Sequence, residues 1–135
     1  MIIPKIEKDG YIAYNVPYQY ALDNGLISQE EFSIIEKGIK KSSGIASLNQ
    51  NRTIETKQIT VELSNGAILN GDETSQSRIS RAVLGLPDNE TEIPWIDASG
   101  EAVMLTKPDL QEALTLAGAK QTEIFTKYAQ LKAEL

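Results

Sequence analysis

The sequence predicts an α+β fold with two short β-hairpins and two helices, the second of them long, preceded by an N-terminal strand-helix segment. Two observations lead to this prediction. In the second half of the chain, apolar and polar residues alternate on both sides of glycine-containing turns, which is typical of hairpins. Residues that cap helices stand before each stretch in which apolar side chains recur every three or four positions.

The N-terminal segment, residues 1–41, begins with a short strand. Tyr11–Val16 is rich in aromatic and β-branched residues, and Pro17 prevents it from continuing as a central strand. A short helical turn follows, and Gly25 is expected to close it in the left-handed conformation. Ser28 and Glu31 then form a capping box at the start of a longer helix.

We expect this helix to end near Lys41, because Ser42-Ser43-Gly44 follows it. Residues 42–56 are polar and have little to bury, so they are predicted to be a linker before a C-terminal domain at residues 57–135. The alternative is an ordered loop that packs on the surface of that domain.

The C-terminal domain should open with a hairpin and a helix. Residues 58–70 alternate around Asn65-Gly66, which favours a two-residue turn. Asp72 is a plausible N-cap for a helix over Glu73–Leu84, and Gly85 with the following Leu-Pro pair ends that helix.

A second hairpin and the long helix complete the domain. The strands are Glu92–Ile96 and Glu101–Leu105, joined by an Asp-Ala-Ser-Gly turn, and the proline in the first strand suits a sheet edge. Thr106 and Asp109 form a capping-box-like pair. No strong breaker follows, so the last helix is predicted to run to Leu135.

The composition excludes several classes of function. The chain has 135 residues and a net charge of −6, which argues against nucleic-acid binding, since that requires a basic surface. It contains no His and no Cys, which removes the commonest general base and the commonest ligands of transition metals. We therefore predict a protein that is not an enzyme, without catalytic, cofactor-binding or metal-binding residues. Two carboxylates alone can run glycoside hydrolysis, but the acidic pairs here stand at helix starts and in loops.

Membrane insertion and secretion are not expected. No apolar run approaches the length of a membrane span, and the first nine residues lack the apolar core of a signal peptide. The chain should therefore be made and folded in a cytoplasm.

The order of motifs in the second half of the chain resembles a small domain of unknown function that is found in tail-fibre and tail-fibre-assembly proteins of bacteriophages and prophages. The resemblance covers about residues 59–135. It is carried by a short hairpin, a helix with a Ser-Gln-x-Arg-Ile motif, a tryptophan-bearing strand, its return strand and a Thr-started helix, at Val61–Gly66, Ser75–Ile79, Pro94–Asp97, Glu101–Leu105 and Thr106.

The resemblance implies a phage tail-fibre accessory, an assembly chaperone that binds the fibre protein in the cytoplasm of the host bacterium. The alternatives are a self-associating virion or tail-fibre subunit, which would place the protein in the virion tail, and a small regulatory binding protein. Because the family has no assigned chemistry, the candidate partner-binding residues come from the sequence itself: Ile124, Tyr128, Leu131, Arg78, Arg81, Tyr14 and Tyr18.

The long helix carries the first group of candidates. Its apolar residues follow steps of four and three, which is the seam spacing of a coiled coil. The same spacing is typical of an amphipathic helix that packs on the hairpins of its own domain. A helix from Lys107 to Leu135 is about 40 Å long, whereas a strand pair spans about 17 Å. We therefore expect Ile124, Tyr128 and Leu131 to contact another chain, in a homo-oligomer or in a complex with the fibre protein.

The other candidates each have a structural alternative. Arg78 and Arg81 lie one turn apart and suit a forked anion site, or Arg78 pairs with a nearby carboxylate such as Asp72 or Glu73. Trp95 is predicted to anchor the core between its hairpin and the last helix, with an interface as the alternative. Tyrosines near the N-terminus, including Tyr14 and Tyr18, suit docking on a partner or a sugar, or packing on the adjacent helix.

Overall fold

The computed structural model describes residues 2–135 and confirms the α+β fold class. The chain forms two compact units, one up to Ile45 and one from Ala46 to Leu135. They are called here the N-terminal unit and the C-terminal unit.

The N-terminal unit is a hairpin followed by helices. The strands β1 (Ile2–Lys8) and β2 (Tyr11–Pro17) pair antiparallel through the two-residue turn Asp9-Gly10. Both turn residues have positive φ, 50° and 80°, which is the type I′ geometry that matches the twist of a hairpin. The sequence predicted the second of these strands but not the first.

The short helix α1 (Tyr18–Asp23) follows at once, and Gly25 with φ 69° lies just beyond its end, as predicted. Asn15, with φ 53°, interrupts the alternation of β2, which allows Ala13 and Val16 to contact the same small core. That core is centred on four buried residues: Ile6, Val16, Ala21 and Ile27.

The helix α2 (Gln29–Lys57) is much longer than predicted. The capping box at its start is confirmed, because the Glu31 amide donates to the Ser28 hydroxyl and the Ser28 amide donates to the Glu31 carboxylate. The expected end near Lys41 and the linker over residues 42–56 are wrong. Serine and glycine only weaken a helix, and the residues after Gly44 gain a partner helix in the C-terminal unit.

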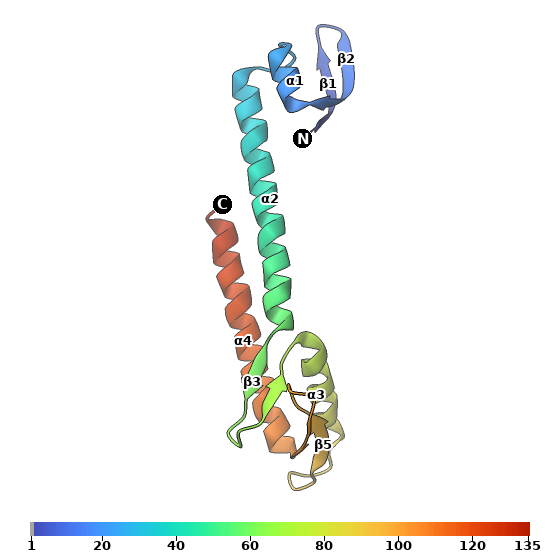
Figure 1. Cartoon of the computed structure of the whole chain (residues 1–135), viewed down its shortest axis with the longest axis vertical. Coiled ribbons are helices and arrows are strands. Elements are labelled where there is room, and N and C mark those ends of the chain that lie inside the picture. Colours follow the sequence, from blue (N-terminus) through green and yellow to red (C-terminus); the bar gives the residue numbers. More distant parts are fainter. Residues whose placement is uncertain (1) are drawn as a thin grey trace. The chain divides into compact units, whose positions relative to one another are not determined.

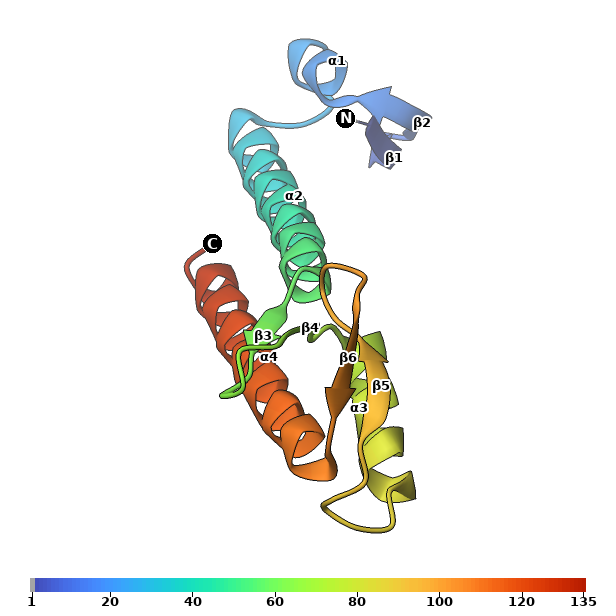
Figure 2. The same ribbon diagram turned by 60° about the horizontal axis from the view of Figure 1, so that its bottom comes forward.

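The C-terminal unit contains the two predicted hairpins. One pairs β3 (Thr60–Glu62) with β4 (Ile68–Asn70), and the other pairs β5 (Ile93–Ile96) with β6 (Ala102–Leu105). The helix α3 (Glu73–Gly85) connects the hairpins and packs against α4 (Lys107–Ala133). Figures 1 and 2 show α4 running past both hairpins.

Both hairpins turn through three residues, so the predicted two-residue Asn-Gly turn is wrong. The Leu63 amide donates to the Ala67 carbonyl, and the Asp97 amide donates to the Glu101 carbonyl. In each loop only the last residue, Gly66 or Gly100, has positive φ, which is the geometry of a type I turn followed by a glycine bulge. The capping box of Thr106 and Asp109 is present as predicted.

The core of the C-terminal unit lies where the hairpins meet α3 and α4. Its largest fully buried side chains are Leu69, Ile79, Leu105, Leu110 and Val61. Trp95 packs against this cluster but is only partly buried, so the prediction that it anchors the core is wrong. These aliphatic side chains, which fill the centre of the core, come from β3, β4, α3, β6 and α4.

Candidate functional site

The C-terminal half of α4 packs against residues 46–57 of α2, both within the C-terminal unit (Figure 1). Lys127 Nζ donates to both carboxylate oxygens of Glu55, each at 2.7 Å. The Arg52 guanidinium lies over the Phe125 ring, 5.4 Å from its centroid, within the range of a cation–π interaction. Charged groups and one aromatic ring therefore join the two helices.

Hydrogen bonding and burial shift the pKa values of these groups. The hydrogen bond from Lys127 lowers the pKa of Glu55, and the same bond raises the pKa of Lys127. Burial, followed by the hydrogen bond to Glu55, raises the pKa of Tyr128. At neutral pH the pair is therefore a carboxylate and an ammonium, beside a phenol that keeps its proton.

The three helix residues predicted to contact a partner have different surroundings. Ile124 packs against the core cluster, Tyr128 is buried, and only Leu131 remains exposed, at 38%. We expected the C-terminal part of α4 to contact another chain because no other part of the same chain was predicted to cover it. The end of α2, which had been predicted as a linker, lies there instead.

Some apolar surface remains on the outer part of α4. Phe125 and Leu131 are 41% and 38% exposed, and Leu135 beyond the helix is 49% exposed. Phe125 and Leu131 stand three residues before and three after the buried Tyr128, so they flank it on the helix surface.

Arg78 and Arg81 do not form one site. Arg78 lines a hollow with Trp95, and Arg81 lines another hollow with Gln121. The alternative pairing with carboxylates does not occur either: among residues 2–135 neither arginine forms an ion pair. Asp72 accepts a hydrogen bond from Ser75.

A glutamine pair, which the sequence analysis had not assigned, holds α3 to α4. Gln76 Nε2 donates to the Gly71 carbonyl at 2.9 Å and to Gln121 Oε1 at 2.7 Å. Gln121 Nε2 in turn donates to Glu73 at 3.1 Å. The Gln of the Ser-Gln-x-Arg-Ile motif therefore has a structural role, because it links α3 to Gln121 of α4.

The two N-terminal tyrosines that were predicted to contact a partner differ in exposure. Tyr14 is 66% exposed, whereas Tyr18 is half-buried at the start of α1. On the outer face of the hairpin, Tyr14 stands opposite Lys5 and Ile12 opposite Glu7. The ion pair of Lys5 and Glu7, at 3.3 Å, lies on that face.

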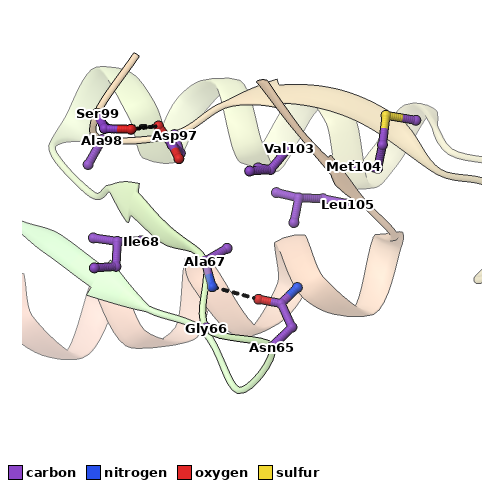
Figure 3. Close-up of a pocket in the computed structure, with 10 residues that line it drawn as sticks. All are labelled: Asn65, Gly66, Ala67, Ile68, Asp97, Ala98, Ser99, Val103, Met104 and Leu105. Atoms are coloured by element: carbon purple, nitrogen blue, oxygen red, sulfur yellow. Dashed lines mark hydrogen bonds between the residues drawn. The ribbon is translucent and has the colours of Figure 1, made fainter. Parts of the chain in front are cut away.

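A groove between the two hairpins of the C-terminal unit was not predicted. Its walls come from the turn and start of β4, from the Asp97 turn and from β6: Asn65, Gly66, Ala67, Ile68, Asp97, Ala98, Ser99, Val103, Met104 and Leu105 (Figure 3). Ile68 and Met104 are 48% and 54% exposed. The sequence signal that could have predicted this groove is the presence of large apolar residues, Ile68 and Met104, at strand positions that face outward.

The only charged residue in the groove wall is committed to its own turn. Asp97 Oδ1 accepts from the Ser99 hydroxyl at 2.6 Å and from the amides of Ser99 and Glu101, both at 2.9 Å. The Ser99 hydrogen bond is the main cause that lowers the pKa of Asp97. Among residues 2–135 no three carboxylates lie close enough together to hold a metal ion.

The family assignment rests on a match that covers the whole C-terminal unit and the last residues of the N-terminal unit. The model of the family described as Domain of unknown function (DUF4376) matches residues 40–135. The chain belongs to this family. The DUF4376 match begins inside α2, so it includes the helix that packs on α4, whereas the resemblance noted from the sequence began near residue 59. No curated protein and no solved structure matches the chain significantly.

Across residues 2–135, none of the helices is both long enough and apolar enough to cross a bilayer.

Proposed function

We propose that this protein is a phage tail-fibre accessory, an assembly chaperone that binds the fibre protein and catalyses no reaction. We name the fibre protein as the partner because the motifs of this chain resemble those of tail-fibre-associated domains. The observation that carries a binding role is the apolar surface that lines the groove between the two hairpins, where Ile68 and Met104 are 48% and 54% exposed. Clustered apolar surface of this kind marks interaction sites.

The titratable groups support a role without catalysis. Each carboxyl with a shifted pKa is shifted downward by hydrogen bonds: Glu55 by Lys127, Asp88 by Thr91 and Asp97 by Ser99. A general acid requires the opposite shift, toward neutral pH. These carboxylates stay ionised and hold turns or a helix pair.

A second candidate function is a self-associating subunit of the virion or tail fibre. Phe125, Leu131 and Leu135 favour it, because they leave apolar surface on the outer end of the chain. The two roles differ in where the protein ends up. A chaperone is absent from purified phage particles, whereas a subunit is present in them in fixed proportion to the fibre protein.

The test is co-expression with a tail-fibre protein from the same phage or prophage genome, which the proposal names as the partner. An affinity tag on this chain should retain the fibre protein, and mass spectrometry of purified particles should find the fibre protein but not this chain. Retention of no fibre protein would contradict the proposal. Presence of this chain in the particles would favour the structural subunit.

A further inference from the structure

We propose that the free edge of β6 is a binding site for an extended peptide segment, which pairs with it as an added strand. This inference rests on the proposed function for the identity of the partner, the fibre protein. Its site and chemistry come from the groove between the hairpins, which is outside the surfaces that the sequence singled out.

The groove runs along strand edges. Its wall contains three consecutive residues of β6, Val103–Leu105, and no residue of β5. A hollow over the face of the hairpin would contain alternate residues from both strands. The opposite wall contains the consecutive residues Asn65–Ile68, and β4 and β6 are not hydrogen-bonded to each other (Figure 3).

The backbone of β6 presents unpaired groups to this groove. The Asp97 amide bonds to the Glu101 carbonyl, so alternation along an antiparallel pair makes Ala102 and Met104 non-hydrogen-bonded positions. Their N–H and C=O groups point away from β5. Pro94, which has no N–H, stands opposite Met104, as this alternation requires. Among residues 2–135, these groups of Ala102 and Met104 have no partner outside their own hairpin.

The same reasoning applies to the opposite wall. The Leu63 amide bonds to the Ala67 carbonyl, so the polar groups of Ile68 point away from β3. The Ile68 carbonyl accepts the Ala98 amide at 2.8 Å, which closes one end of the groove. Backbone groups in a row are complementary to another backbone, and strand addition is a common mode of peptide recognition.

The wall also defines the side chains of the occupant. Its one charged residue is Asp97, at the closed end, and the adjoining exposed side chains, Ile68 and Met104, are apolar. An acidic segment would meet an ionised carboxylate without a counter-charge, so it is disfavoured. The occupant is therefore an extended segment of the fibre protein, about four residues long as β6 is, with no acidic residue and apolar side chains at alternate positions.

Proline scanning of the hairpin tests this proposal in the full-length chain. Met104→Pro removes an N–H that faces the groove and makes no bond to β5. Ile96→Pro is the matched control, because Ile96 is also at a non-hydrogen-bonded position but on the outer edge of β5. With the fibre protein as the titrant, Met104→Pro should weaken binding about tenfold, as expected for one lost hydrogen bond, and Ile96→Pro should not.

Amide exchange of the unmutated chain provides a measurement that does not depend on the folding of a variant. Addition of the fibre protein should slow exchange at Ala102 and Met104 and leave Ile96 unchanged. If the fibre protein binds but neither the amides nor the Met104→Pro variant respond, the strand site is wrong and the accessory role stands. No binding by the wild-type chain would contradict both. Protection of Met104 in a dimer of the chain alone would identify a second copy as the occupant and overturn the proposal.

Discussion

At the scale of single residues, Gly71 determines how closely the hairpin of β3 and β4 approaches α4. A Cβ built on Gly71 would lie 2.8 Å from the Ile59 side chain and 3.0 Å from Ala117 Cβ, and both residues belong to the core. Neither neighbour has a flexible end that can move aside. We expect Gly71→Ala to lower the free energy of unfolding by about 1–3 kcal/mol, because it overpacks the core.

Gly118 provides a matched control for that substitution. It lies inside α4, and a Cβ there would have no neighbour within 4 Å. Gly118→Ala should raise the stability by up to about 1 kcal/mol through helix propensity alone. Urea unfolding of the two variants measures both effects, and equal effects in the two would contradict the close packing of Gly71.

Trp95 and Leu110 provide a second comparison at this scale. Leu110 is fully buried, so Leu110→Ala should cost about 2–5 kcal/mol. Trp95 is only partly buried, so Trp95→Ala should cost less than Leu110→Ala, although a larger side chain is removed. If thermal or urea unfolding shows a larger loss of stability for Trp95→Ala than for Leu110→Ala, Trp95 is a central core residue and this account of the core is wrong.

Local motifs were the part of the structure that the sequence predicted well at this scale. The capping boxes at Ser28 and Thr106 involve groups three residues apart, so the motif contains the whole interaction. The Asn65-Gly66 turn was misjudged because the loop closes one residue earlier, at Leu63, and turn length depends on the register of the hairpin. The burial of Trp95 depends on distant elements, which no local motif contains.

At the scale of elements, the error with the widest effect was the linker. Residues 42–56 are polar because they belong to a helix that buries no residue fully, and such a helix resembles a linker in composition. Because α2 extends to Lys57, Tyr128 has a partner within the same chain, Glu55 of α2. The hairpin of β1 was also missed, although Asp9-Gly10 between apolar residues was a usable signal.

Truncation tests the pairing of α2 with α4. A chain of residues 46–135 should keep the amides around Tyr128 protected from exchange, because Glu55 and Arg52 are present. A chain of residues 58–135 should lose that protection while the core around Leu69 stays protected, because the core lies against the inner part of α4. Equal protection near Tyr128 in both chains would contradict the pairing.

The ion pair of Glu55 and Lys127 predicts how this pairing depends on pH. The pKa of Glu55 is lowered from 4.5, so its contribution to stability is present above that value and is lost as the pH falls through the lowered pKa. The pKa of Lys127 is raised from 10.5, so its contribution is lost only as the pH rises through that raised pKa. Between these limits the pair is insensitive to pH.

Glu55→Gln tests this dependence, because it removes the charge and keeps the shape. The variant should be less stable than the wild type at about pH 7, and the difference should be smaller at an acid pH below the lowered pKa of Glu55. Urea midpoints at the two pH values measure the difference. A difference that stays constant down to the acid limit would mean that the carboxylate charge does not contribute.

At the scale of the whole molecule, the chain combines stable local structure with apolar surface that its own fold leaves in water. Met104 and Ile68 line the groove, Leu131 and Phe125 remain exposed on α4, and Tyr14 is exposed on the N-terminal hairpin. The sequence predicted Leu131 and Tyr14 as contact residues, but it did not predict the groove, because its two walls meet only in the folded C-terminal unit.

The central claim is that this chain assists assembly of a fibre protein, and the most direct measurement is the yield of that assembly. The fibre protein would be expressed alone, with the wild-type chain and with Met104→Pro, and soluble assembled fibre would be quantified by size-exclusion chromatography with light scattering. We predict that assembled fibre forms efficiently only with the wild-type chain. Equal yields of assembled fibre with and without the chain would contradict the account.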